Sequence, residues 1–116
     1  MLGVDYSEKA IELATEISKE RGLEECIEFK CSNVVTEDYL KWAGQAFDVV
    51  LDKGTFDAFS LSDEQLEDGR RVADGYVQSI VQTVKPGKWF VITSCNWTEE
   101  ELKRKFEGVG GMSHLV

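Results

Sequence analysis

Residues 47–61, FDVVLDKGTFDAFSL, pass from an apolar run into a charged pair and a glycine, and then into aromatic residues. The run 47–51 is apolar except for Asp48, which predicts a strand buried on both faces, as in parallel sheets. Residues 52–55, DKGT, follow at its end. Ligands of open α/β sheets bind beyond the carboxyl ends of the strands, so these four residues are predicted to form one wall of a site.

Strand patterns and helix patterns alternate on both sides of this stretch. The predicted strands are a short one ending at Asp5, then 26–31, 47–51 and 89–93. One predicted helix begins after the cap Ser7 and stops at Gly22, and a short one covers 36–42 before Gly44. A third begins at Ser62 and ends at Pro86, and a fourth covers 99–106 with Thr98 as its cap. This alternation predicts the α/β class, with a Rossmann-like, doubly wound and mostly parallel sheet.

Two of these helices carry more detailed predictions. In the first, Ala10, Leu13, Ala14 and Ile17 recur at helical spacing and are predicted to face a core. In the third, residues 62–65 fit a capping box, and Gly69 is a plausible break.

Composition narrows the class of protein. The 116 residues suffice for one domain at most, and no apolar run approaches the ~20 residues that span a bilayer. With 22 acidic and 13 basic residues, the net charge of −9 disfavours nucleic acid and suits solubility or a basic partner. The three cysteines form no CxxC pair, and the sequence has a single histidine. Few residues could therefore ligate zinc or form a Ser-His-Asp catalytic triad. No secretory signal pattern precedes the first strand, so we expect an intracellular protein.

Three polar residues follow three predicted strand ends: Asp5, Asn33 and Asp52. Parallel strands bring such residues to one edge of the sheet. There an acid can accept the hydroxyls of a ribose, a small polar residue can hold an adenine edge, and a third residue can face the reactive end of the ligand. Each position also has a structural interpretation, since Asp5 can belong to a helix start and Asp52 can cap a turn.

Residues 2–14 (LGVDYSEKAIELA), 47–61 and 89–102 (WFVITSCNWTEEEL) together resemble the motifs of a known enzyme family. The family is that of class I S-adenosylmethionine methyltransferases, in the branch of eukaryotic lysine methyltransferases that act on translation elongation factor 1-alpha. The resemblance covers residues 2–107, and DKGTFDA and TSCNWT are its most specific parts.

The resemblance implies S-adenosyl-L-methionine as cofactor and assigns roles to residues. Asp5 would bind the ribose, and Asn33 with Val34 would flank the adenine. Asp52 would lie by the methionine moiety and the methyl group, and Tyr6 would also contact the cofactor. Substrate-binding residues would be Lys53, Thr55, Phe56, Asn96 and Trp97, and the catalytic residues would be Asp52 and Asn96. For Phe56 and Phe59 a core position is the favoured alternative, and Trp97 can instead staple the helix that Thr98 caps.

The family pattern also contains a glycine-rich first strand at the centre of the sheet and a C-terminal hairpin, and this sequence shows neither. We therefore expect a partial domain over 1–107, a loose tail over 108–116, and a truncated gene product or partial gene model. Without the central strand, two rows of backbone groups stay unpaired or the two halves pair directly. The alternatives to a monomeric, cytoplasmic and also nuclear methyltransferase are an inactive binding module and a fragment of a nicotinamide-dependent oxidoreductase.

Overall fold

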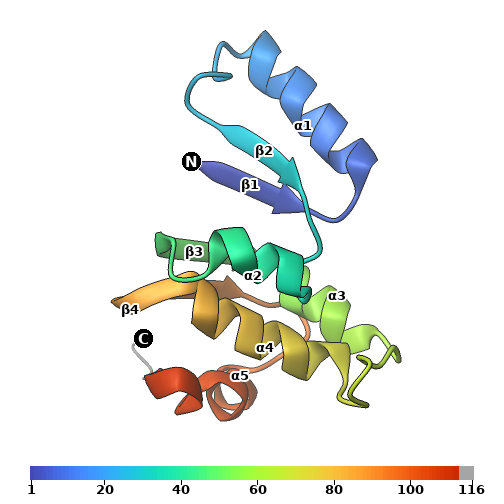
Figure 1. Ribbon diagram of the computed structural model, residues 1–116, viewed down its shortest axis with the longest axis vertical. Coiled ribbons are helices and arrows are strands. Elements are labelled where there is room, and N and C mark those ends of the chain that lie inside the picture. Colours follow the sequence, from blue (N-terminus) through green and yellow to red (C-terminus); the bar gives the residue numbers. More distant parts are fainter. Residues whose placement is uncertain (113–116) are drawn as a thin grey trace. The chain divides into compact units, whose positions relative to one another are not determined.

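In the computed structural model, helices and strands alternate along residues 1–112, which are the residues that the structure describes (Figure 1). The strands are β1 (Leu2–Asp5), β2 (Glu28–Cys31), β3 (Phe47–Lys53) and β4 (Val84–Thr93). The helices are α1 (Glu8–Glu20), α2 (Glu37–Ala43), α3 (Thr55–Leu61), α4 (Val72–Thr83) and α5 (Glu99–Phe106), followed by a 3-10 turn, η1 (Val109–Gly111). The predicted α/β class is confirmed.

The chain divides into two compact units, Met1–Val34 and Val35–Val116, and each contains one pair of strands. β1 pairs with β2, and β3 pairs with β4, both in parallel, as predicted. Among residues 1–112 the strands thus form two sheets of two strands each. One edge of β1 and one edge of β3 therefore have no strand partner in the described part of the chain.

Local signals define the helix of the first unit. The Ser7 hydroxyl accepts a hydrogen bond from the Ala10 amide at 3.3 Å and caps α1. Beyond the helix, Gly22 lies at a φ of 68°, in the left-handed region that favours glycine. Both predicted ends of this helix are confirmed to within two residues. In β1, a Cβ atom on Gly3 would approach the Phe29 ring within 2.7 Å, so this close packing of strand and ring requires glycine.

The predicted core face of α1 is only partly buried. Leu13 is 58% exposed and Ile17 is 40% exposed, which contradicts the expectation that both face a core. Ser18 is the only buried residue of this helix. The reason is geometric, because the two-stranded sheet of the first unit offers too narrow a surface to cover every apolar position of a helix that is 13 residues long.

The core of the second unit is an aromatic cluster built by four elements. Phe56 of α3 is 1% exposed, and its ring lies 5.8 Å from that of Tyr76 on α4 and 5.2 Å from that of Phe106 on α5. The ring of Phe90 on β4 lies 5.2 Å from that of Phe106. Most of the other buried apolar side chains belong to α4, namely Val72, Ala73, Val77 and Ile80. The cluster thereby ties α3, α4 and α5 to the sheet.

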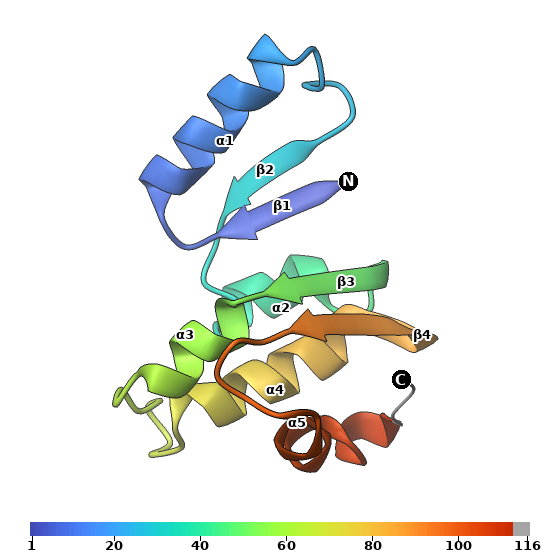
Figure 2. The same ribbon diagram turned by 180° about the vertical axis from the view of Figure 1, so that it is seen from behind.

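Among the described residues of the second unit, helices cover one face of the β3–β4 pair. Figures 1 and 2 show α2 and α4 on the same side of these strands. On the other side Val49, Leu51, Trp89 and Val91 are 52%, 72%, 53% and 48% exposed. The prediction of a strand buried on both faces is therefore wrong for β3, since an apolar run does not reveal whether the chain supplies a second covering layer.

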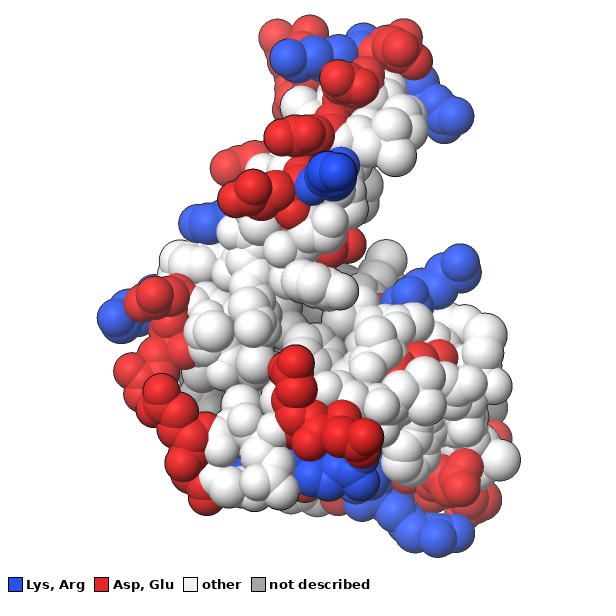
Figure 3. Space-filling model, turned by 90° about the vertical axis from the view of Figure 1, so that its right-hand side faces the viewer, with Lys and Arg blue, Asp and Glu red and all other residues white. Residues whose placement is uncertain are grey.

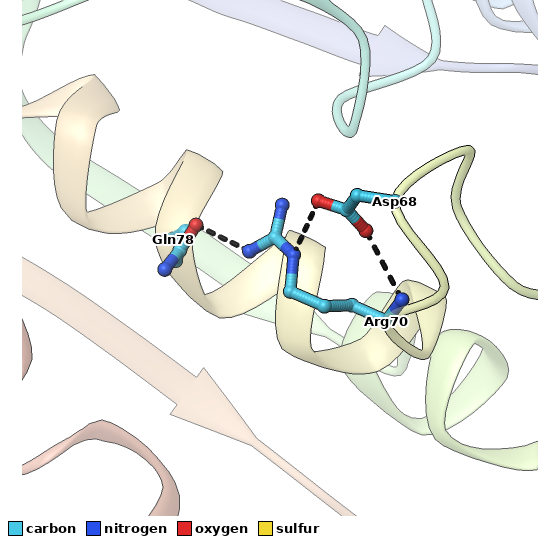
Figure 4. A network of polar contacts seen from close by, with 3 residues as sticks. All are labelled: Asp68, Arg70 and Gln78. Atoms are coloured by element: carbon cyan, nitrogen blue, oxygen red, sulfur yellow. Dashed lines mark hydrogen bonds and ion pairs between the residues drawn. The ribbon is translucent and has the colours of Figure 1, made fainter.

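Residues 62–71 form a loop, although the sequence predicted the start of a helix there. The Ser62 hydroxyl accepts from the Glu64 amide at 3.2 Å, and α4 begins only at Val72. Gly69 lies at a φ of 86° and turns the chain within this loop, so the predicted helix is not broken at this glycine but begins only after it. Figure 4 shows how Arg70 then bonds Asp68 at 2.7 Å and Gln78 at 2.5 Å, which ties the loop to α4.

Two more segments differ from the sequence-based expectations. β4 begins at Val84, five residues earlier than predicted, and Gly87 at a φ of 75° lies within it beside an irregularity in the register with β3. After α5, the turn η1 contacts α4, and a Cβ on Gly110 would lie 2.1 Å from a methyl carbon of Val81. The predicted loose tail is thus packed through Gly111, and its last four residues lie outside the described ones.

Candidate functional site

The ends of β1 and β2 bring the first group of predicted site residues together. Asp5 and Cys31 are register partners, and the Ser32 amide donates to the Asp5 carbonyl at 2.9 Å. Asp5 ends β1 and Tyr6 follows it, while Asn33 and Val34 come shortly after the end of β2, and all four lie within one compact unit. The juxtaposition predicted from parallel pairing of the strands is therefore present for these four residues.

One carboxylate oxygen of Asp5 makes a structural contact, and the other is open to a ligand. Its Oδ1 accepts from the Ser7 amide at 2.8 Å, which supports the start of α1. The residue is exposed, and among residues 1–112 its Oδ2 has no hydrogen-bond partner. A carboxylate offers about four acceptor positions, so this group is chemically fit to accept the hydroxyls of a ribose while it holds Ser7.

The residues around Asp5 offer an apolar and aromatic surface beside the carboxylate. Tyr6 is 77% exposed, and its carbonyl accepts from the Cys31 thiol at 3.4 Å, which ties the end of β1 to β2. Val34 is half-buried and Asn33 is exposed. An exposed ring, an amide side chain and an aliphatic side chain are suited to contact with a heterocyclic base.

Asp52 lies at the end of β3, where it caps α3. Its Oδ1 accepts from the Thr55 amide at 2.8 Å and its Oδ2 accepts from the Phe56 amide at 3.0 Å. Gly54, at a φ of 87°, turns the chain between strand and helix. The structural interpretation of Asp52 as a cap is thus correct, and α3, which the sequence did not predict, depends on it.

A third donor reaches the same carboxylate from α4. The Tyr76 hydroxyl donates to Asp52 Oδ2, and the two residues are 2% and 5% exposed. Burial raises the pKa of Tyr76 well above its usual value, and the neighbouring Asp52 carboxylate raises it further. The phenol therefore stays protonated as a donor. The Asp52 carboxylate thus accepts three hydrogen bonds, which hold it against α3 and α4.

The remaining predicted residues after β3 differ in accessibility. Lys53 and Thr55 are exposed and are available to a ligand. Phe56 is 1% exposed and packs against the ring of Trp97 at 5.4 Å. Phe56 is a core residue in this structure, as the favoured alternative had it, and it has no surface for contact with a substrate.

Residues 94–97 form the second half of this part of the site. The Trp97 indole N–H donates to the Ser60 hydroxyl at 2.9 Å, and the ring is half-buried against Phe56. Asn96 is exposed, and within residues 1–112 its side chain has no hydrogen-bond partner. The structure thus brings Asn96 and Trp97 to α3, with Asn96 open to solvent and Trp97 fixed.

Sequence reasoning missed the residues that organise this region. Tyr76 holds Asp52, and Asp57 accepts from the Ser94 hydroxyl and from the Cys95 amide at 2.9 Å. One signal was available, since a second acid five residues after Asp52 falls in the first turn of a helix that starts at Thr55. Because the sequence did not predict α3, Asp57 could not be placed in the first turn of a helix.

Figure 3 shows acidic and basic side chains interspersed on one face of the molecule. In the part of the chain that the structure describes, no three potential ligands among His, Cys, Asp and Glu gather as for a metal ion. None of the described helices has the length and apolar character to cross a membrane.

Comparison with known proteins gives these residues a context. Protein-lysine N-methyltransferase efm4 of Schizosaccharomyces pombe is 41% identical over 98% of this chain and 47% of its own length. EEF1A lysine methyltransferase 2 of Danio rerio is 42% identical over 92% of this chain and 43% of its own length, and the human protein of that name is 41% identical over 90% and 41%. The chain spans less than half the length of these curated relatives.

A solved structure and a family description extend the comparison. The crystal structure of the [4+2]-cyclase SpnF aligns with a TM-score of 0.57 and 21% identity, covering 78% of this chain and 28% of that one. This likeness concerns the fold alone, and it supports the predicted Rossmann-like arrangement. The family described as "Methyltransferase domain" matches residues 1–113. The chain therefore belongs to the methyltransferase domain family.

Proposed function

We propose that this chain is part of a protein-lysine N-methyltransferase that transfers a methyl group from S-adenosyl-L-methionine to a lysine of translation elongation factor 1-alpha. The observation that carries the proposal is the 41% and 42% identity, over nearly the whole chain, to relatives named for lysine methylation and for EEF1A. The nicotinamide-dependent alternative lacks such support, because the family match is to methyltransferases.

The cofactor would be held at the ends of β1 and β2. Asp5 would accept the ribose hydroxyls through its free Oδ2, with Tyr6 beside it, and Asn33 and Val34 would flank the adenine. Their common location at one sheet edge supports this assignment. S-adenosylmethionine supplies the reactive methyl carbon, so the protein contributes binding, orientation and exclusion of water.

The acceptor lysine would lie near residues that follow β3 and β4. A free lysine has a pKa near ~10.4, so the site must favour the neutral amine by desolvation or accept its proton. Lys53, Thr55 and Asn96 are exposed and would contact the acceptor, and Trp97 would border its aliphatic stem. Asp52 would act by holding α3 and the Thr55 amide, since its carboxylate already accepts three hydrogen bonds.

The chain spans less than half the length of these relatives, so catalytic activity of this chain by itself is part of the proposal. The named relatives are about twice as long, so their activity belongs to a longer protein. An inactive module that docks a basic partner is the alternative, and the net charge of −9 favours such a partner. We further propose a monomer in the cytoplasm, and also in the nucleus, without nucleic acid or membrane as partner.

Calorimetric titration with S-adenosylmethionine and with its demethylated product tests the cofactor assignment. We expect saturable binding to the wild-type chain and at least about tenfold weaker binding to Asp5→Asn, because the amide loses a charged acceptor for the ribose. Asp63→Asn is a matched control, since Asp63 is exposed and has no polar partner among the described residues. Equal affinities for both variants would contradict the role of Asp5.

Transfer of a labelled methyl group to purified elongation factor 1-alpha tests the activity. Incorporation into a lysine supports the enzyme. Cofactor binding without transfer would indicate a module that needs the rest of a longer protein. Absence of both, with salt-sensitive binding to the elongation factor, would favour the inactive docking module.

A further inference from the structure

The carboxylate of Asp57 is buried without a cation. The residue is 7% exposed, and among residues 1–112 it forms no ion pair with lysine or arginine. Its two oxygens accept from neutral donors instead, Oδ1 from the Ser94 hydroxyl and Oδ2 from the Cys95 amide at 2.9 Å. Burial of a carboxylate is costly unless hydrogen bonds compensate it, so these bonds account for its place in the fold.

Ser94 extends the hydrogen-bond network of Asp57 to the next residues of the chain. Its hydroxyl gives its only hydrogen to Asp57 and accepts from the Asn96 amide at 3.2 Å and the Trp97 amide at 3.0 Å. A serine hydroxyl has one donor and two acceptor positions, so its capacity is used completely. Asp57 thereby determines, directly or through Ser94, the partners of three successive amides in residues 95–97.

A second link runs from Asp57 to the Trp97 ring. The Ser60 hydroxyl donates to the Asp57 carbonyl at 2.8 Å and accepts from the Trp97 indole at 2.9 Å. The Lys105 ammonium lies over the indole ring, 5.8 Å from its centroid. Trp97 is thus held by both its backbone and its ring, and Asn96 is the exposed side chain between two anchored neighbours.

We propose that Asp57 is a positioning residue that sets the conformation of residues 94–97. The functional part of this inference rests on the proposed function, because Asn96 and Trp97 are assigned there to the acceptor lysine. The conformational part rests on hydrogen bonds alone. Asp57 touches neither cofactor nor acceptor in this assignment, and it acts only through the loop.

Asp57→Asn tests the carboxylate with little change of shape. An asparagine side chain has one acceptor oxygen, while the Ser94 hydroxyl and the Cys95 amide both need an acceptor. One donor loses its partner, so we expect the amides of Cys95, Asn96 and Trp97 to exchange with deuterium about tenfold faster. The matched control is Asp63→Asn, which changes the same group at an exposed position of the loop 62–71.

Ser94 supplies a pair of variants that remain informative if Asp57→Asn fails to fold. Ser94→Ala removes the donor to Asp57 and the acceptor for two amides, whereas Ser94→Thr keeps the hydroxyl. We expect Ser94→Ala to accelerate exchange of the Asn96 and Trp97 amides and to shift the Trp97 indole resonance. Ser94→Thr should retain wild-type exchange. Wild-type protection in Ser94→Ala, or in folded Asp57→Asn, would overturn the proposal.

Kinetics separate the conformational part from the functional part. With elongation factor 1-alpha as substrate, Asp57→Asn should raise KM for the acceptor by about tenfold and leave cofactor affinity unchanged. Faster loop exchange with an unchanged KM would overturn the functional part. Absence of both cofactor binding and methyl transfer in the wild-type chain would count against the proposed function, while the exchange experiment still decides whether Asp57 positions the loop.

Discussion

At the scale of single residues, two buried carboxylates organise the region around α3. Asp52 receives two amides of the helix start and the phenol of Tyr76, and Asp57 receives a hydroxyl and an amide from the segment after β4. All these donors are neutral. Each acid is therefore compensated by local dipoles, which hold the ends of β3 and β4 in defined contacts with α3.

The Tyr76 phenol provides a prediction with a defined pH range. Burial and the Asp52 carboxylate raise its pKa above 10.0, so its contribution to stability is complete below about pH 10 and decreases as the pH rises further. Tyr76→Phe removes the donor to Asp52 and should lower the free energy of unfolding by about 1–3 kcal/mol at pH 7. Above pH 10 the wild-type protein should lose up to about 1.4 kcal/mol more per pH unit than the variant.

Denaturant titrations between pH 7 and pH 11 measure this difference. Tyr6→Phe is the matched control, because Tyr6 is 77% exposed and should show no such effect. The raised pKa of Tyr39, caused by its burial, leaves some alkaline loss of stability in every variant. A constant gap between wild type and Tyr76→Phe across the whole range would contradict the prediction.

At the scale of elements, the β3–β4 pair is a sheet with one covered and one open face. The open face carries the cross-strand neighbours Val49 with Trp89 and Leu51 with Val91. Four large apolar side chains on adjacent strands make a contiguous surface rather than scattered single residues. The covered face instead holds Asp52 and the aromatic cluster, so Asp52 and the open face belong to opposite sides of the same strands.

Binding of an apolar fluorescent dye should depend on this open face. Leu51→Lys should lower dye fluorescence and change the free energy of unfolding by less than about 0.5 kcal/mol, because the side chain is already exposed. Leu61→Lys on α3 is the control, since Leu61 is 73% exposed and lies outside the sheet. Equal dye binding by the two variants would show that the β3–β4 face is not the binding surface.

At the scale of the whole molecule, the core is distributed unequally between the two units. All buried apolar side chains, from Tyr39 to Phe106, belong to the second unit. In the first unit, which the structure describes completely, Ser18 is the only buried residue. A segment of 34 residues with two strands and one helix has little area to bury, so we expect it to open independently of the rest.

Native-state hydrogen exchange measures this difference directly. The amides of β1, β2 and α1 should exchange more than tenfold faster than those of β3 and α4, which corresponds to an opening free energy lower by at least about 1.4 kcal/mol. The cofactor, if bound at Asp5, should reduce the difference by stabilising the first unit. Uniform protection across both units would show instead that they unfold as one.

The sequence by itself determined what depends on near neighbours. The caps Ser7 and Thr98 and the glycine stop at Gly22 follow from patterns within a few residues, and the strand patterns place Asp5 and Asn33 at or just after strand ends. Such features need no knowledge of distant contacts, because a capping bond or a strand pattern is formed by adjacent parts of the chain.

Only the tertiary structure decided which groups far apart in sequence meet. The bonds from Tyr76 to Asp52 and from Ser94 to Asp57 span 24 and 37 residues, and no local pattern specifies them. The exposure of Leu51 and the burial of Phe56 likewise depend on which layers cover β3 and α3. Burial is a property of the assembled layers, so apolar residues with similar local patterns end on opposite sides of the sheet.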